Sequence, residues 1–191
     1  MAFQQTNQQF STGNNSGEKK KTNFRVGRVY ATDGTVDVSV WNSDKGGCFC
    51  ILSIKAAVGK DPSTGTNVYE QKMSGELPSM VMNLEMVRAF LEVVKKQDPE
   101  NLNFKLDTNR GSSITVAGAG SSIKVTIENA KNGTRTVTFD AVPVGSTNVH
   151  ANWRNLVDMV DICFKKALRN KLDPEEFAMV GEDENSSDLP I

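Results

Sequence analysis

The chain has 191 residues, of which 38% are hydrophobic and 24% charged, a composition typical of a globular protein with one compact domain or two small ones. No apolar run approaches the roughly 18 residues of a transmembrane helix, and the first ten residues have neither the basic start nor the apolar stretch of a secretory signal. Three cysteines do not predict a disulfide framework, so we expect a reducing compartment such as the cytoplasm.

Charge is distributed unevenly along the chain, although the net charge is only −1. Residues 173–191 hold seven of the 23 acids and no base, so residues 1–172 carry 22 bases against 16 acids, a net charge of +6. Residues 1–22 are rich in Gln, Asn, Ser, Thr and Gly, with too little apolar surface to fold. We therefore predict a disordered leader over 1–22, one domain over 23–172 and a flexible acidic tail over 173–191.

The first half of the domain predicts strands and then a helix. Strand-like runs at 24–30, 35–41 and 48–57 are separated by the turn sequences Asp33-Gly34 and Lys45-Gly46-Gly47. We expect residues 60–78 to form a long mobile hairpin and residues 79–82 to add a fourth strand. Asn83 then suits the N-cap of a helix over 84–96, which carries an apolar stripe at three- and four-residue spacing and ends in Lys95-Lys96.

The second half predicts the same order of elements. Strand candidates at 103–106, 113–117, 123–128 and 134–142 are divided by turn glycines, and a long helix follows over 151–171, with Trp153 in its apolar stripe. The pattern is four strands and a helix, repeated over about 23–97 and 101–171. Short turns between strands favour antiparallel pairing. We therefore predict an α+β domain of two ββββα units, in which two four-stranded antiparallel sheets pack through the two helices.

Catalytic and metal-binding patterns are missing from the sequence. It contains no nucleophile elbow, no Walker loop and no zinc-protease motif. The single histidine, His150, has no Cys or carboxylate at ligand spacing, and a zinc site would have to bring it and Cys163 to Cys48 and Cys50 from far away. We expect free, buried cysteines, no metal or cofactor, and a protein that binds rather than catalyses.

Alternation along the strands predicts a polar and aromatic surface on the first sheet. The valines of the strand 35–41 point to one side and Trp41 to the other, together with Phe49 and Lys55 of the next strand. Aromatic rings among spaced cations are what single-stranded nucleic acid requires. Alternatively, Trp41 covers a sheet edge or packs under the 60–78 hairpin. The candidate binding residues, with those that the second half adds by the same alternation, are Arg25, Arg28, Tyr30, Trp41, Phe49, Lys55, Lys60, Tyr69, Lys72, Lys105, Arg110, Lys124 and Arg135.

The last ten residues, Glu-Asp-Glu-Asn-Ser-Ser-Asp-Leu-Pro-Ile, resemble the acidic tip of bacterial and phage single-stranded-DNA-binding proteins. Their last residue, Ile191, stands where those tips usually have an aromatic. The resemblance implies a flexible acidic segment whose apolar end docks on replication or recombination proteins. The residues to which it assigns partner binding are Asp183, Glu184, Asp188, Leu189, Pro190 and Ile191.

The repeated ββββα order over residues 23–172 resembles the Whirly family and the related transcriptional positive coactivators. The junction at 80–85, where a polar cap follows the last strand, is similar to theirs, although the lysine-rich signature of plant Whirly proteins is absent. This resemblance implies single-stranded-DNA binding over curved antiparallel sheets. An OB-fold β-barrel, the usual bacterial binding fold, is the alternative architecture.

These observations favour a non-enzymatic protein of a phage or bacterial replicon. We expect it to bind and protect single-stranded DNA in replication or recombination, in the cytoplasm of the cell or host, with no membrane contact. The alternative is a virion structural or assembly protein without nucleic-acid binding, although such a protein does not need a basic body with an acidic tail. RNA binding and a homo-oligomeric state both stay open.

Overall fold

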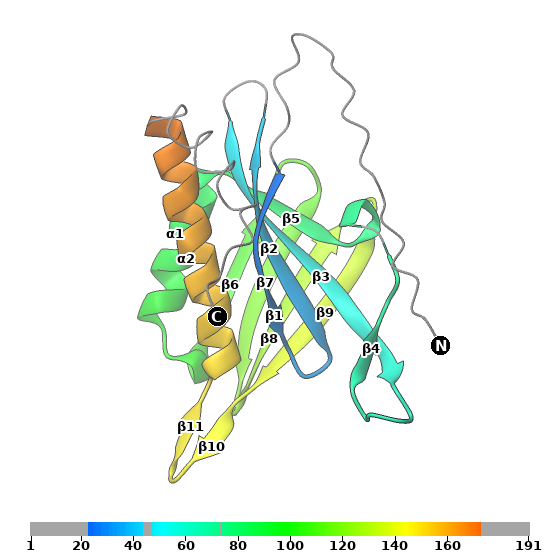
Figure 1. The fold of residues 1–191 in the computed structure, drawn as a ribbon. Helices are drawn as coiled ribbons and strands as arrows, with labels where there is room; N and C mark the ends of the chain where they lie inside the picture. The colour runs from blue at the N-terminus through cyan, green and yellow to red at the C-terminus, as the bar shows by residue number, and fades with distance from the viewer. Residues whose placement is uncertain (1–22, 44–46, 73, 173–191) are drawn as a thin grey trace, which may run out of the picture.

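Two large antiparallel sheets, a short hairpin and two α-helices make up the residues that the computed structural model describes, 23–43, 47–72 and 74–172 (Figure 1). The predicted leader and acidic tail lie outside these residues. The α+β class with antiparallel sheets is therefore confirmed. No helix in the described ranges is long and apolar enough to cross a membrane.

The first sheet is built on the long strand β3 (Cys48–Lys60). β1 (Asn23–Tyr30) pairs with β2 (Gly34–Asn42), and β2 pairs with β3. β5 (Ser79–Met82) pairs with the middle of β3, while β4 (Asn67–Tyr69) pairs with its end. The expected 60–78 hairpin is thus a β3–β4 hairpin followed by a short 3₁₀ turn at Ser74–Glu76.

Helix α1 (Leu84–Lys96) begins and ends as the sequence predicts. The side-chain Oδ1 of Asn83 accepts a hydrogen bond of 2.9 Å from the amide of Met86, as an N-cap residue does. The helix buries Val87, Phe90, Leu91 and Val94. Its last turn places Lys95 and Lys96 at the negative end of the helix dipole.

The second sheet has the order β6-β7-β8-β9, from β6 (Asn103–Asp107), β7 (Ser112–Ala119), β8 (Ser122–Asn129) and β9 (Gly133–Asp140). A 3₁₀ turn at Pro99–Asn101 leads into it. The predicted strand 134–142 is too long, because β9 ends at Asp140 and a separate hairpin follows. This hairpin, β10 (Val142–Val144) and β11 (Thr147–Val149), turns at Gly145 with φ +61° and precedes α2 (Ala151–Leu172).

The prediction that the sheets pack through the helices is wrong in one respect: the sheets also pack directly on each other. Side chains from both sheets and both helices form one cluster, for example Leu52, Phe90, Phe139 and Val160. β3 lies close to β9, and β5 close to β7 and β8. The physical reason is that each sheet has an apolar face wider than one helix can cover. We call the buried face of each sheet its inner face and the opposite one its outer face.

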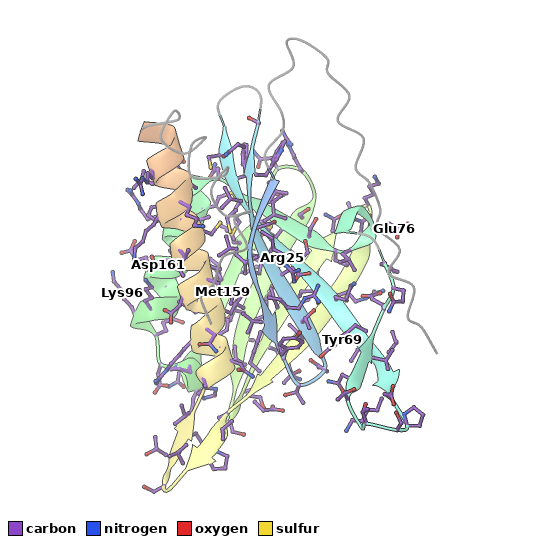
Figure 2. All side chains as sticks on the ribbon, in the orientation of Figure 1. Arg25, Tyr69, Glu76, Lys96, Met159 and Asp161 are labelled. Carbon is purple, nitrogen blue, oxygen red and sulfur yellow. The ribbon has the colours of Figure 1, made fainter. Side chains whose placement is uncertain are left out.

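Close backbone approaches mark where these layers meet. A Cβ on Gly34 would lie 2.5 Å from Cγ1 of Val137 in β9 and 2.7 Å from the carbonyl oxygen of Lys55. A Cβ on Gly27 would lie 2.8 Å from the sulfur of Met159, so α2 sits directly on the inner face of β1 (Figure 2). Trp153 is only 2% exposed and packs against Phe139 with ring centroids 6.1 Å apart, which confirms its predicted core position.

We expect Gly34→Ala to destabilise the fold by about 1–3 kcal/mol, because the added methyl group overlaps a core side chain and a fixed carbonyl. Gly59→Ala is the matched control, since nothing lies within 4 Å of a Cβ there. It should be neutral or stabilising by up to about 1 kcal/mol through the unfolded state. Urea denaturation of both variants measures the difference, and equal stabilities would contradict the direct packing of the two sheets at Gly34.

Candidate nucleic-acid interface

The outer face of the first sheet gathers six of the candidate binding residues. Strand register places Trp41 opposite Phe49, Asp37 opposite both Arg28 and Ser53, and Thr35 opposite both Tyr30 and Lys55. These positions alternate with the buried valines of β2, so they lie on the opposite side of the sheet from the core, where Thr35 is itself fully buried and the others are partly or fully exposed. We call this surface the first-sheet face; its candidate residues are Arg25, Arg28, Tyr30, Trp41, Phe49 and Lys55.

A β-bulge brings the two arginines of β1 to the same side. Strict alternation would place Arg25 and Arg28 on opposite faces, because they are three residues apart. The register shifts between Arg25 and Gly27, so Arg25 lies opposite Ser39 and Arg28 opposite Asp37. The extra residue, Val26, packs against the core instead. The sequence carries no separate signal for this bulge.

Asp37, which the sequence reasoning did not include among the binding residues, engages both arginines. Its Oδ1 accepts hydrogen bonds from Nε of Arg28 at 2.7 Å and from a guanidinium nitrogen of Arg25 at 2.8 Å, and its Oδ2 accepts a second bond from Arg28 at 2.9 Å. Burial alone would raise the pKa of Asp37, but the hydrogen bonds and charge of Arg28, and then of Arg25, lower it below its ordinary value. The cluster therefore keeps a net positive charge in a fixed geometry.

An aromatic pair lies at one end of this face. The rings of Trp41 and Phe49 stack with centroids 5.2 Å apart and planes 28° apart, and both residues are partly exposed. The backbone of Gly47 supports the pair, because a Cβ there would lie 2.8 Å from the Phe49 ring. The neighbouring cross-strand pair of Ile51 and Val81 adds apolar surface. One side of the Trp41 ring is thus held by Phe49.

A second aromatic pair, Tyr30 at the end of β1 and Tyr69 of β4, lies toward the other end of this sheet. The rings of Tyr30 and Tyr69 are 6.2 Å apart and inclined by 52°, and Tyr30 is 56% exposed. Lys60 lies further out, exposed and opposite Asn67 in the β3–β4 hairpin. The first-sheet face therefore runs from one aromatic pair to another, with the basic residues between and beside them.

Arg135 does not join this face, and its predicted orientation is wrong. In β9 it lies opposite Ile127 and is two and four residues from the buried Val137 and Phe139, so it shares their side of the strand. Its guanidinium donates two hydrogen bonds of 3.3 Å to the carboxylate of Glu70, which is only 8% exposed. Alternation counted from the strand's threonines would have found this orientation.

Glu70 is a structural acid that also engages Lys72. Its Oε1 accepts a hydrogen bond of 3.0 Å from the amide of Ala56, and Nζ of Lys72 lies 3.5 Å from its Oε2. Burial would raise the pKa of Glu70, but the Ala56 amide, Arg135 and Lys72 together lower it. Lys72 and Arg135 therefore serve first as counterions that allow this carboxylate to be buried.

The remaining candidates belong to the second sheet. Lys105 and Lys124 lie on its outer face, among the cross-strand threonines Thr115, Thr126 and Thr136. Arg110 is exposed in the β6–β7 turn. Both inner faces enter the same core, so the outer faces of the two sheets lie on different sides of the molecule. The thirteen candidates therefore do not form one continuous surface.

The cysteines lie closer together than the sequence suggested. Cys50 of β3 contacts Cys163 of α2, which corrects the expectation that they are far apart. Interaction with the Cys163 thiol and then burial raise the pKa of Cys50 well above its ordinary value, and a raised thiol pKa disfavours the nucleophilic thiolate. Cys48, Cys50 and Cys163 are all buried. In the described ranges, no group of three or more His, Cys, Asp and Glu residues could hold a metal ion.

Compared with known proteins, the chain matches no family model, no curated protein and no solved structure. The partner-binding candidates Asp183, Glu184, Asp188, Leu189, Pro190 and Ile191 lie outside the described residues. Among the described residues, the candidate site therefore rests on structure alone: the first-sheet face is where strand pairing places six candidate residues on one surface.

We expect Asp37→Asn to destabilise the protein at pH 7 by about 1–3 kcal/mol, because hydrogen bonds to a charged group are lost and two arginines are left facing each other. The folded-state pKa of Asp37 lies below its ordinary value of 3.8, so its contribution is fully present above that pH and disappears as the pH falls through the folded-state pKa. Urea denaturation should show the difference from the unsubstituted protein shrinking below about pH 4.

The control is Asp107→Asn, which removes the carboxylate from an exposed pair with Lys105 at 3.3 Å. Exposed pairs contribute little to stability. A loss at Asp107 as large as that at Asp37 would show that the arginine cluster is not a specific stabilising unit.

Proposed function

We propose that this protein binds and protects single-stranded DNA through the first-sheet face, without catalysing a reaction, during replication or recombination of a phage or bacterial replicon. The observation that carries the proposal is the partly exposed Trp41–Phe49 pair on the same face as the arginines that Asp37 orients. The first-sheet face thus combines partly exposed aromatic rings with oriented guanidinium groups, and all of these residues lie on β-strands rather than on loops.

The chemistry of unpaired DNA fits this combination. Bases that have left a duplex expose flat π-surfaces, which stack on aromatic side chains in a sequence-tolerant way. Phosphates attract spaced cations, and arginine presents a planar fork of donors to them. Phe49 holds one side of the Trp41 ring, so a base is expected to stack on the other.

The length of the face suits a short stretch of nucleotides. Trp41 and Thr35 are six residues apart on β2, which corresponds to about 20 Å along a strand. Tyr30 and Lys55 flank Thr35 at that end. A strand of DNA that lies along β2 would meet an aromatic pair at each end and Arg25 and Arg28 on the way.

The fold proposal is that of two ββββα units similar to Whirly proteins and the related coactivators. The chain order of strands followed by a helix, twice, supports it, with β4 and the β10–β11 hairpin as additions to the four-strand pattern. Two antiparallel sheets that pack on one shared core also keep the OB-like barrel as the alternative architecture.

An assembly or virion structural protein is the alternative function. The exposed Val142 and Val144 of the β10–β11 hairpin, 56% and 60% exposed, favour a protein contact at that hairpin. The charge of +6 on residues 1–172 favours the nucleic-acid proposal instead. We further propose that the acidic tail recruits replication or recombination proteins, in the cytoplasm of the cell or host.

The first test of the proposal is affinity for DNA of different form and at different salt. Binding should be much tighter for single-stranded than for duplex DNA, and log Kd should rise by roughly 0.7 per log unit of salt for each phosphate neutralised. Titration of tryptophan fluorescence with oligo-dT at two salt concentrations measures both, with a duplex of equal length as the control. Binding that prefers duplex or ignores salt would favour the assembly alternative. Repeating the titration with oligo-rU decides between DNA and RNA.

The second test separates the two outer faces. Trp41→Ala should weaken binding of oligo-dT by about 1–3 kcal/mol, because a stacked base loses its platform. Lys55→Gln on the first-sheet face should weaken binding and lower the salt slope, whereas the charge-matched Lys124→Gln on the second sheet should do neither. A larger loss at Lys124 than at Lys55 would place the DNA on the other sheet.

A further inference from the structure

A groove of about 370 Å³ lies between α1 and α2, outside the proposed DNA-binding surface. Leu91 of α1 and Phe164 of α2 provide its apolar lining. The helices lie against the inner face of the first sheet, as the contact of Met159 with Gly27 shows, so the sheet separates this groove from the first-sheet face. Figure 2 accordingly shows Lys96 and Asp161 on the helices and Arg25 on the strands.

Bases outnumber acids around this groove. Arg88, Lys95 and Lys96 line it together with the acids Glu92 and Asp161. Asp161 is shared by two lysines, with Nζ of Lys95 at 3.1 Å and Nζ of Lys165 at 2.9 Å. Lys96 pairs with Glu92 at 2.6 Å. The groove and its border thus carry four bases against two acids.

Arg88 is held in a way that suits an added carboxylate. Its guanidinium carbon lies 5.7 Å from the centroid of the Phe164 ring, a cation–π contact. A guanidinium held over a ring keeps its in-plane N–H donors for a carboxylate. The groove therefore offers an apolar floor beside a fixed donor of positive charge, which is the complement of an acidic peptide with an apolar end.

The end of this chain is such a peptide. Glu182, Asp183, Glu184 and Asp188 precede Leu189-Pro190-Ile191, with no base among the last ten residues. The last residue that the structure describes, Leu172, ends α2 eight residues after Phe164, about 12 Å along the helix. Sixteen residues separate Leu172 from Leu189, and a random coil of that length would span on average about 22 Å. The tail is long enough to return to the groove, and the tether gives it an effective concentration in the millimolar range.

We propose that the tip, Asp183–Ile191, docks in the groove between α1 and α2 of its own chain. Leu189, Pro190 and Ile191 lie on Leu91 and Phe164, and the carboxylates of the tip pair with Arg88, Lys95 and Lys96. The tip is then occupied until a partner protein displaces it. The last point rests on the proposed function, but docking itself does not, and a docked tip leaves the first-sheet face open to DNA.

The test is carbodiimide cross-linking of the full chain without DNA, which joins carboxylates to lysines in direct contact. Equal amounts of ¹⁵N-labelled and unlabelled protein distinguish links within one chain from links between copies. Mass spectrometry should find the tip carboxylates linked to Lys95 or Lys96, with both peptides of one isotope. The pair of Lys95 and Asp161 serves as the internal standard for yield and for an intact groove.

Two variants should each lower the yield of tip links about tenfold, the effect of losing one charge-assisted or apolar anchor. Arg88→Gln removes the cation over Phe164, and Ile191→Asp removes the apolar end while adding an acid. The matched control Arg110→Gln, an exposed base in the β6–β7 turn, should leave the yield unchanged.

Three results would overturn the proposal. Tip links chiefly to Lys55, Lys60 or Lys124 would place the tail on a sheet instead. Links of mixed isotope would place it on a second copy. If Ile191→Asp gave the same or a higher yield of tip links, charge alone would attract the tail. None of these readouts depends on DNA, so failure here and failure of the proposed function are distinguishable.

Discussion

The burial of two sheets against one shared core determines which side chains this protein can present to a ligand. Leu52 of β3 and Phe139 of β9 enter the same cluster, and α2 closes it with Val160. Because side chains alternate along a strand, burying one face of each sheet exposes the other. Thr35 of β2 is fully buried, but Asp37, Trp41 and Phe49 lie outside the core, and their strands hold them in fixed rows. A binding surface of this kind needs no loop to order when ligand arrives.

A departure from regular strand geometry decides which basic side chains lie on the first-sheet face. The bulge at Val26 turns Arg25 and Arg28 to one side, where a single carboxylate, that of Asp37, engages both. An acid in the middle of a proposed DNA-binding face lowers its charge but fixes the direction of two guanidinium groups. Fixed donors lose less conformational entropy on binding than free ones. Glu70, in contrast, does not present its basic partners to a ligand. Arg135 and Lys72 neutralise its buried carboxylate instead.

The distribution of charge links the domain to its tail. Bases of the described residues lie on both outer faces and on the helix pair, so the +6 charge of residues 1–172 does not belong to a single surface. The two proposed sites differ in chemistry because of this division. Aromatic rings accompany the bases on the first-sheet face, as stacked nucleotides require, whereas Leu91 and Phe164 accompany those between the helices, as a peptide requires.

The sequence by itself determined what depends on neighbours along the chain. The period of two in β2 and β8 identified the buried side of each strand, and Asn83 marked the start of α1, because capping and alternation are local. Turn residues predicted most of the hairpins for the same reason. Trp153 was recognisable as a core residue from the spacing of its helix.

Tertiary structure alone decided the contacts between distant segments. The ion pair of Arg135 and Glu70 joins residues 65 positions apart, and Cys50 contacts Cys163. Gly34 has no side chain, which leaves room for Val137 of the other sheet. A local pattern says which side of a strand is apolar, but not which other apolar face will cover it. The bulge at Val26 is likewise invisible in the sequence, because it depends on the register with β2. The shared core determines these long-range contacts, because the two sheets can bury their apolar faces together in only a few relative arrangements.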